Sequence, residues 1–372
     1  MPPDFTQTTR LEFSVERDRT LVCRHLDSSK SAARITKDFS EAVLALVLKY
    51  PKAGRLRFEL SGGDGLEEGV LFPMLGLALG GLRVPIDVEV RVDGEVVSVE
   101  PPDYASVGKL EDWLRAIRTR PVLPPELEAL ARDVPGGALA WHRTVTGTEW
   151  SGRVFGCQIM TIADSGRGRM TVGRPGSQRR PGPRQRFLEA VVGQNGIELD
   201  VDSLSEQRPT IERFAETHPR DDEHALEASV LGGETSVIVR GRPLTRLIGG
   251  VPFQFPTMWN AHEAECRYLD ILMRDGERPW AVELKWGSLA EYTRNGVVQA
   301  ALYREFIRRA KTLHPIFRDH GVDPEACEAI LAYPRTTKQS AKRSYIAELA
   351  RLFGVEIVEL DVRFPTQKKN RT

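Results

Sequence analysis

The sequence predicts an α/β protein, with a C-terminal mixed sheet flanked by helices and a separate N-terminal α/β module. Strand-like alternation and helical periodicity follow one another in both halves of the 372-residue chain. An Asp-Gly turn between two apolar runs, within residues 267–286, predicts a hairpin inside the C-terminal sheet. Because 41% of the residues are hydrophobic and 28% are charged, the chain can form about two well-filled domains.

The N-terminal module is predicted to span residues 1–105. Apolar residues alternate in three runs, which predicts strands at residues 11–15, 56–60 and 86–99. The last run folds back at Asp93-Gly94, so we expect a hairpin with one solvated face. Apolar residues at helical spacing predict a helix over residues 39–50.

A connecting region with an Arg-rich linker is predicted at residues 106–200. Short helices are expected at 109–118 and 125–132, and strand-like runs at 138–150 and 152–163. Residues 151–190 hold eight arginines against Asp164 and Glu189, although the whole chain has no net charge. Residues 166–186 are also rich in Gly and Pro, which indicates either a basic loop that follows phosphates or a solvated linker.

The C-terminal domain is predicted at residues 201–365, followed by a basic tail at 366–372. Its first expected elements are a helix at 222–231, a first core strand at 234–240, which either ends there or continues through Leu247 and Ile248 into residues 251–256, and the hairpin. A helix with an apolar side, a strand at 328–333, a helix at 340–353 and a strand at 355–360 are expected to follow; the apolar side consists of Val298, Leu302, Phe306 and Ala310. Gly354 is placed to end the last helix.

Three polar residues stand within the apolar runs of the hairpin: Asp270, Glu283 and Lys285. A loop of four residues, 275–278, pairs Asp270 with Glu283, whereas a two-residue turn at 275–276 pairs it with Ala281. Both loops are even-numbered, so both leave the three side chains on one face of the sheet. Buried charges must pair or bind something, and a divalent cation beside the lysine would satisfy all three.

The order of these residues resembles the PD-(D/E)XK nuclease superfamily, in which an Asp precedes Glu-x-Lys on the neighbouring strand. Gln299 and Tyr303 reproduce the Q-x-x-x-Y element of its RecB-type branch. The resemblance covers residues 234–360, and Leu269 stands where the family name has proline. It implies a restriction-endonuclease-like fold for the C-terminal domain.

The resemblance also implies the roles of the site residues. Asp270 and Glu283 would bind Mg²⁺, or Mn²⁺ as a substitute, often together with the backbone carbonyl of Leu284. Lys285 would orient or deprotonate the attacking water and offset phosphate charge. Gln299 and Tyr303 would contact the surroundings of Lys285 or the substrate backbone. The predicted catalytic set is therefore Asp270, Glu283, Lys285, Gln299 and Tyr303.

Two further polar groups are candidates for the site. The resembled family often carries another acid on the helix before the first strand, where Glu223, His224 and Glu227 are available and Glu227 is preferred. A solvated helix face is the alternative. The second group is His262, Glu263 and Glu265, for which a loop of solvated charges is the alternative.

Other features exclude several classes of protein. Residues 70–84 are too short for a membrane span and contain Pro73, and the N-terminus lacks the pattern of a signal peptide. The scattered cysteines at 23, 157, 266 and 327 indicate reduced thiols without a zinc site or disulfide frame. A cytoplasmic protein is expected.

The sequence thus predicts a metal-dependent nuclease that hydrolyses phosphodiester bonds. DNA is the expected substrate, because most of the resembled branch acts on it, and bacterial DNA repair or defence against foreign DNA would both suit the chain. The N-terminal module would recognise a substrate, a protein partner or a small-molecule signal. Two alternatives stay open: a non-catalytic binding or assembly module with the nuclease fold, and an effector nuclease gated by a small molecule or a partner protein.

Overall fold

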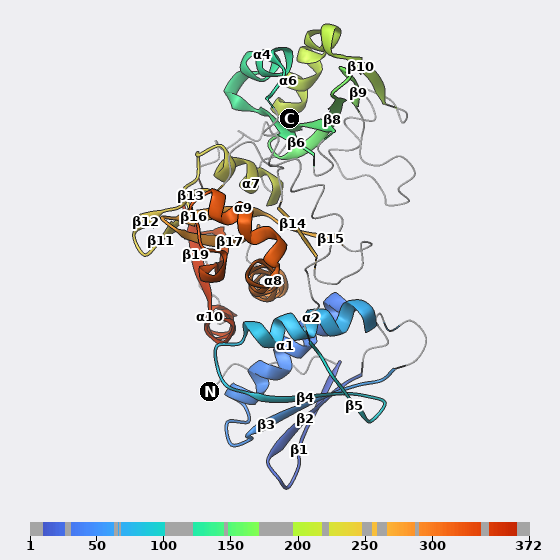
Figure 1. Cartoon of the computed structure of the whole chain (residues 1–372), viewed down its shortest axis with the longest axis vertical. Coiled ribbons are helices and arrows are strands. Elements are labelled where there is room, and N and C mark those ends of the chain that lie inside the picture. Colours follow the sequence, from blue (N-terminus) through green and yellow to red (C-terminus); the bar gives the residue numbers. More distant parts are fainter. Residues whose placement is uncertain are drawn as a thin grey trace, which may run out of the picture. The chain divides into compact units, whose positions relative to one another are not determined.

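The computed structural model confirms a mixed α/β protein with several sheets flanked by helices (Figure 1). It describes residues 10–26, 31–62, 66, 68–100, 122–144, 148–170, 196–217, 223–247, 255–258, 266–286, 290–335 and 342–362. The chain forms two compact units. The first unit holds residues 1–108, 239–247 and 256–359, and the second holds 109–238, 248–255 and 360–372.

The N-terminal part of the first unit is a five-stranded sheet covered by two helices. Its strands, in spatial order, are β1 (Leu11–Val15), β2 (Thr20–His25), β3 (Arg55–Leu60), β4 (Asp87–Val92) and β5 (Glu95–Val97). Strands β2, β3 and β4 are parallel, and α1 (Ala32–Leu48) and α2 (Glu68–Gly81) connect them. The hairpin turns at Asp93-Gly94, as predicted, with φ of 51° and 88°.

Both helices of this part differ from the sequence analysis. Helix α1 begins at Ala32, because Ala32 and Ile35 continue the buried side that the sequence analysis began at Phe39. The stretch at 70–84 was considered only as a membrane span, but it belongs mostly to α2, with Pro73 inside the helix. Helix α2 is apolar because α1 packs on it and so does α8 (Ala290–Arg309) of the C-terminal part.

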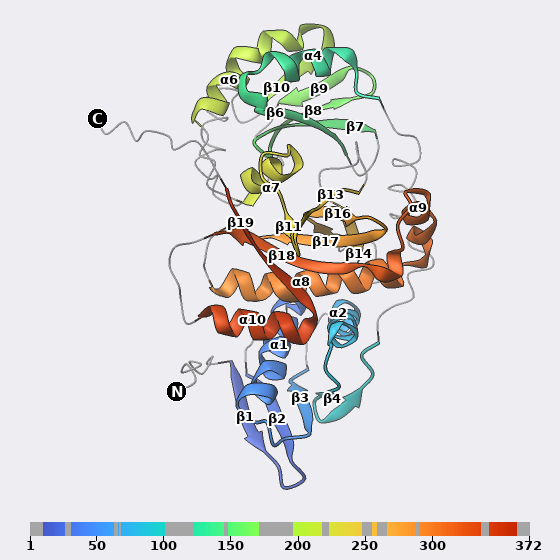
Figure 2. The ribbon, with the colours of Figure 1, turned by 90° about the vertical axis from the view of Figure 1, so that its left-hand side faces the viewer.

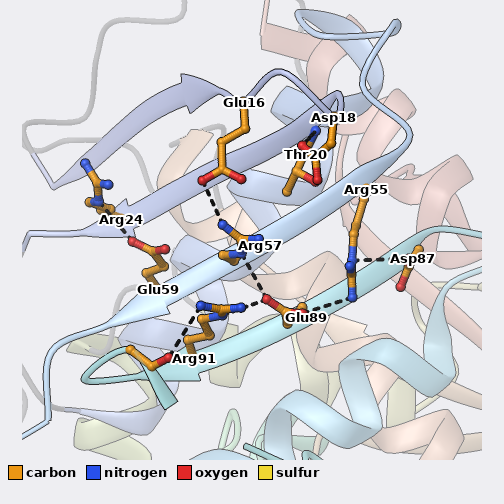
Figure 3. Close-up of polar contacts among 11 residues, drawn as sticks. Glu16, Asp18, Thr20, Arg24, Arg55, Arg57, Glu59, Asp87, Glu89 and Arg91 are labelled. Carbon is orange, nitrogen blue, oxygen red and sulfur yellow. Dashed lines mark hydrogen bonds and ion pairs between the residues drawn. The ribbon is translucent and has the colours of Figure 1, made fainter. Parts of the chain in front are cut away.

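The other face of this sheet carries a network of ion pairs (Figure 3). Glu89 accepts hydrogen bonds from the guanidinium groups of Arg55, Arg57 and Arg91, at 3.0, 2.9 and 2.7 Å. Arg57 also pairs with Glu16 at 2.8 Å, and Arg24 pairs with Glu59 at 2.9 Å. Charges therefore compensate one another along the strands on the face opposite the helices.

The C-terminal part of the first unit is a second five-stranded sheet. Its strands, in spatial order, are β13 (Thr245–Arg246), β16 (Ile271–Asp275), β17 (Arg278–Leu284), β18 (Glu328–Pro334) and β19 (Val355–Leu360). Strand β17 is antiparallel to β16 and parallel to β18. The accompanying helices are α8, η3 (Lys311–Leu313), α9 (His314–Asp319), η4 (Pro324–Ala326) and α10 (Lys342–Phe353). Gly354 follows α10 with a φ of 58°, as predicted.

The predicted first core strand at 234–240 is wrong. Only β11 (Ile238–Val239) forms there, and it pairs with β12 (Arg242–Pro243) in a small separate hairpin. The cause is a turn at Arg240-Gly241, where both residues have positive φ and the chain reverses after two paired residues. The neighbour of β16 in the sheet is β13 instead. A further two-stranded sheet joins β14 (Phe255–Met258) and β15 (Cys266–Leu269).

Helices lie between the two sheets of the first unit (Figure 2). Helix α8 packs on β17 and β18, and α10 packs beside α8. Helix α1 contacts both α8 and α10, and α2 contacts α8. The sequence predicts a separate N-terminal module. In the structure it shares one compact unit with the C-terminal sheet, because α2 buries its apolar surface against α8.

The second unit has its own sheet and core. An antiparallel meander runs through β6 (Leu139–Arg143), β7 (Glu149–Val154), β8 (Cys157–Ala163), β9 (Arg167–Met170) and β10 (Ile197–Asp200). Its helices are α4 (Pro125–Asp133), η1 (Pro135–Gly137), η2 (Val201–Gln207), α6 (Arg208–Thr217) and α7 (Glu223–Leu231). Leu127, Trp150, Ile162 and Phe214 belong to its buried core.

The Arg-rich stretch is only partly described. Arg167 and Arg169 lie on β9, where Arg169 pairs with Glu198 at 3.4 Å, so this part is a strand and not a loop. Residues 171–195, the predicted helix at 109–118 and the basic tail lie outside the described residues. No helix in the described ranges is both long and apolar enough to cross a membrane.

Candidate active site

The register of the β16–β17 hairpin places Asp270 at the position opposite Glu283. Asp275 pairs with Arg278 and Ile271 pairs with Val282, so the next position after Ile271 and Val282 joins Asp270 and Glu283. Of the two registers considered from the sequence, the one with the direct pair is observed. The ladder runs one pair further than expected and turns at Gly276, which has a φ of 59°.

Asp270 occupies a bend between two strands and not the middle of one. Strand β15 ends at Leu269 and β16 begins at Ile271, so the single strand expected through Asp270 is interrupted there. The Asp270 carboxylate accepts a hydrogen bond from the Leu284 backbone N–H at 2.7 Å. Asp270 is buried, at 7% exposure, and this bond ties its carboxylate to the end of β17.

Glu283 and Lys285 form a buried ion pair next to Asp270. They are two residues apart on β17, so their side chains lie on the same face of the sheet. The Lys285 Nζ lies 2.6 Å from Glu283 Oε1, and the side chains are 7% and 2% exposed. The Lys285 N–H donates to the Ala332 carbonyl at 2.9 Å, which continues the pairing with β18 past the end of β17. Removing either partner would leave a buried charge uncompensated.

Helix α8 covers this face of the sheet at Gly296. A Cβ atom at Gly296 would lie 2.7 Å from Leu331 Cδ1 and 3.1 Å from Lys285 Cγ, so any other residue here would require the Leu331 or Lys285 side chain to shift. Gln299 and Tyr303 follow at three and seven residues along the same side of the helix. Tyr303 is buried, and Gln299 is half-buried. The assigned amide oxygen of Gln299 is buried without a hydrogen-bond partner among the described residues.

The parallel pairing with β18 adds a residue that the sequence analysis missed. Leu331 is the register partner of Glu283, and Tyr333 comes next, beside Lys285 on the same face. Tyr333 is buried, at 9% exposure. No local signal marks it, because its position depends on a register set across a long connection. Gly296 did carry a signal: a glycine inside a helical pattern often marks a close approach.

The donor set suits a hard divalent cation. Mg²⁺ binds through one or two carboxylates and takes its other ligands from water and substrate phosphates, which fits Asp270 and Glu283. Because Lys285 contacts Glu283 Oε1, a cation at these carboxylates would compete with the ammonium for that oxygen. The described part of the chain holds no set of three or more His, Cys, Asp or Glu residues arranged to bind a metal.

The additional acidic candidates belong to the second unit or are not described. Glu223, His224 and Glu227 are on α7 in the second unit, and Asp270 is in the first. Glu227 is buried, at 1% exposure, with His224 Nδ1 at 3.7 Å. Burial lowers the pKa of Arg153, and the charge of Glu227 opposes that shift. His262, Glu263 and Glu265 lie outside the described residues.

No protein-family model, curated protein or solved structure matches this chain. Its function must therefore be inferred from the chemistry of the buried residues themselves.

Proposed function

We propose that this protein is a metal-dependent nuclease that hydrolyses phosphodiester bonds in DNA. The observation that carries the proposal is the buried Glu283–Lys285 ion pair beneath α8, beside Leu284, whose backbone N–H binds the buried Asp270 carboxylate. Two carboxylates and an ammonium rarely share an apolar interior without a chemical task, because burying charge is costly. This set matches the needs of phosphodiester hydrolysis.

Hydrolysis forms a bond from a water oxygen to phosphorus and breaks the bond to the leaving oxygen, which takes up a proton. When bound by Asp270 and Glu283, Mg²⁺ supplies positive charge against the phosphoryl oxygens. Lys285 donates hydrogen bonds from Nζ, so it can hold the attacking water and offset phosphate charge. The Leu284 N–H fixes the Asp270 carboxylate, so this ligand is held in place before substrate arrives.

Gln299 and Tyr303 are proposed to contact the substrate backbone or the surroundings of Lys285. Both lie on the side of α8 that carries Gly296, which approaches Lys285 closely. The assigned Gln299 oxygen would accept a hydrogen bond from a water in the site. Tyr303 has a phenol that can donate or accept.

The resemblance to the PD-(D/E)XK superfamily favours DNA as the substrate, and repair or defence against foreign DNA as the setting. The non-catalytic alternative has less support, because a binding module gains nothing from a buried ion pair beside a third charge. The gated-nuclease alternative has a specific observation in its favour, since the N-terminal part of the first unit packs on the helix that covers the site.

The test is cleavage of linear, circular and single-stranded DNA and of RNA, with Mg²⁺, with Mn²⁺ and with a chelator. Asp270→Asn, Glu283→Gln and Lys285→Met keep side-chain size while changing charge. Each should lower the cleavage rate by about 100-fold or more while the far-UV circular dichroism stays native. The chelator should abolish cleavage of every substrate.

A matched control is the exposed ion pair between Lys311 and Glu325, at 2.7 Å. Lys311→Met removes the same charge from a Lys–Glu pair that is exposed, so it should leave cleavage unchanged. Full activity in the folded Glu283→Gln and Lys285→Met proteins, or cleavage that persists with the chelator, would rule out the proposal.

A further inference from the structure

Arg304 is the residue after Tyr303 on α8, and its side chain is fully buried. Its guanidinium donates four hydrogen bonds. Nη1 donates to the carbonyls of Phe353 and Gly354 at 2.9 and 2.7 Å, and Nη2 donates to the Gly81 carbonyl at 2.8 Å. Nε donates to Glu305 Oε1 at 3.0 Å. One side chain thus binds backbone groups from two distant parts of the sequence.

The three carbonyls lie at the carboxyl ends of helices. Gly81 is the last residue of α2, and Phe353 and Gly354 lie at the end of α10. Carbonyls at helix ends lack partners within the helix and carry the negative end of its dipole. A planar guanidinium can serve several of them at once, whereas a lysine presents a single ammonium.

Burying this cation has a cost. Burial lowers the pKa of Arg304, the neighbouring charges of Arg83 and Arg308 lower it further, and Glu305 opposes these effects. Apolar side chains of similar size often stabilise a core better than a buried ion pair does. The hydrogen bonds of Arg304 are therefore better explained by the position that they impose on α8 than by stability.

Gly81 lies directly against this arginine. A Cβ atom there would lie 3.4 Å from Arg304 Nη2 and 3.5 Å from Ala301 Cβ, which is ordinary van der Waals contact, so only a side chain larger than alanine, such as valine, requires a neighbour to move. Two residues later, the Arg83 N–H donates to the Leu352 carbonyl at 2.8 Å. The end of α2 is thereby held against both α8 and α10.

Two residues of the candidate site, Gln299 and Tyr303, lie on the same helix as Arg304. Gly296, which touches Lys285 and Leu331, is about two turns from Arg304, and Gln299 and Tyr303 lie between them. An α-helix is stiff over this length, so a shift at Arg304 would move Gln299 and Tyr303 relative to Lys285.

We propose that Arg304 is a positioning residue through which the N-terminal part of the first unit holds α8 over the candidate site. The consequence for cleavage rests on the proposed nuclease function. The mechanical part does not, because it concerns only how α2, α8 and α10 are held.

The test is a double-mutant cycle in the full chain with Arg304→Met, Gly81→Val and both together. Each single variant should lower kcat for Mg²⁺-dependent DNA cleavage about tenfold or more with KM within about twofold, because α8 shifts while the site residues remain. The kcat of the double variant should be no lower than that of the less active single variant, because both substitutions break the same contact. Arg351→Met on α10 is the control and should leave kcat unchanged, because Arg351 is exposed and its guanidinium pairs with Glu348 of the same helix at 2.6 Å.

Hydrogen exchange of the full chain separates this proposal from the proposed function. Amides at the end of α2 and in α8 should lose protection together in both Arg304→Met and Gly81→Val, whether or not the protein cleaves DNA. Additive effects on kcat, or loss of protection in α2 alone, would overturn the proposal. If Arg304→Met fails to fold, Gly81→Val decides: unchanged protection of α8 would refute the coupling.

Discussion

Lys285 has two neighbours of opposite character. On one side the Glu283 carboxylate compensates its charge at 2.6 Å, and on the other the bare backbone of Gly296 leaves room for its aliphatic stem. The ammonium can therefore stay in the interior with its carboxylate while the helix passes directly over the stem. Gly296 is as much a part of the site as the charged residues.

Gly296→Val should destabilise the protein by roughly 1–3 kcal/mol, because the added methyl groups must displace Leu331 and Lys285. Valine is no worse than glycine as a helix former, so propensity alone predicts no loss. Urea unfolding gives the free energy of unfolding. Gly54→Val is the matched control, since a Cβ there meets nothing within 4 Å, and should change stability by no more than about 0.5 kcal/mol. Equal stability of the two variants would contradict the packing described for α8.

For single residues, the sequence predicts which side chains lie on the same face of a strand, because side chains alternate between the two faces. Glu283 and Lys285 share a face because they are two residues apart on β17, and the register of β16 with β17 is one of the two that the sequence predicts, the one that puts Asp270 opposite Glu283. The hydrogen bond from Leu284 to Asp270 was not predictable, because it depends on the bend that ends β15. The neighbourhood of Tyr333 depends on β18, which pairs with β17 across more than forty residues of chain.

Among the elements, the N-terminal sheet shows how a face without helices is kept polar. Three guanidinium groups converge on Glu89, and hydrogen bonds from Arg91 and Arg57 lower the pKa of this carboxyl below its ordinary value of 4.5 (Figure 3). A carboxyl with a lowered pKa in the folded state contributes stability above its unfolded pKa. That contribution is lost as the pH falls from about 4.5 toward the folded value.

Glu89→Gln should lower the free energy of unfolding at neutral pH, and this difference from the wild type should shrink as the pH falls below about 4.5 and as salt is added. Urea titrations at neutral and acidic pH, each at low and high salt, measure both effects. Glu12→Gln is the control, because Glu12 is largely exposed and its contact with Arg24 Nη1 is long, at 3.5 Å. Such exposed pairs contribute little to stability. A difference that stayed constant across pH would show that the Glu89 charge contributes nothing.

Elements with strong local signals were predicted well. Strand β19 has the predicted bounds, α10 begins two residues after the predicted start, and the β4–β5 hairpin turns at its Asp-Gly pair. Helix α2 was not predicted because it is apolar on every side, so it shows no periodicity to separate a helix from a buried strand. The prediction of a strand at 234–240 was wrong because Arg240 adopts a positive φ, which is uncommon for arginine and cannot be inferred from the residue type.

On the scale of the whole molecule, the first unit joins residues from both ends of the described chain. The sheet of β1–β5 and the sheet of β13 and β16–β19 share the helices between them (Figure 2). We therefore expect the two sheets to unfold together, because exposing α2 removes part of the packing of α8. The second unit has a core of its own and is free to unfold at another denaturant concentration.

Hydrogen exchange of the full chain in increasing denaturant tests this expectation. Peptides from β2–β3 and from β17–β18 should reach one common opening free energy, whereas peptides from β7–β8 should follow their own curve. Opening of β2–β3 at a clearly lower free energy than β17–β18 would show that the N-terminal sheet is a separate domain after all.

The packing of α2 on α8 also determines how long α2 stays partly uncovered during translation. Helix α2 ends at Gly81 and α8 at Arg309, so the ribosome must add 309 − 81 = 228 residues before the side of α2 that packs on α8 can be covered. At roughly 5–20 residues per second this takes about 10–50 s. During that interval the nascent chain exposes an apolar side of α2 beside the sheet of β1–β5. We therefore expect chaperones that bind at the ribosome to bind this nascent chain.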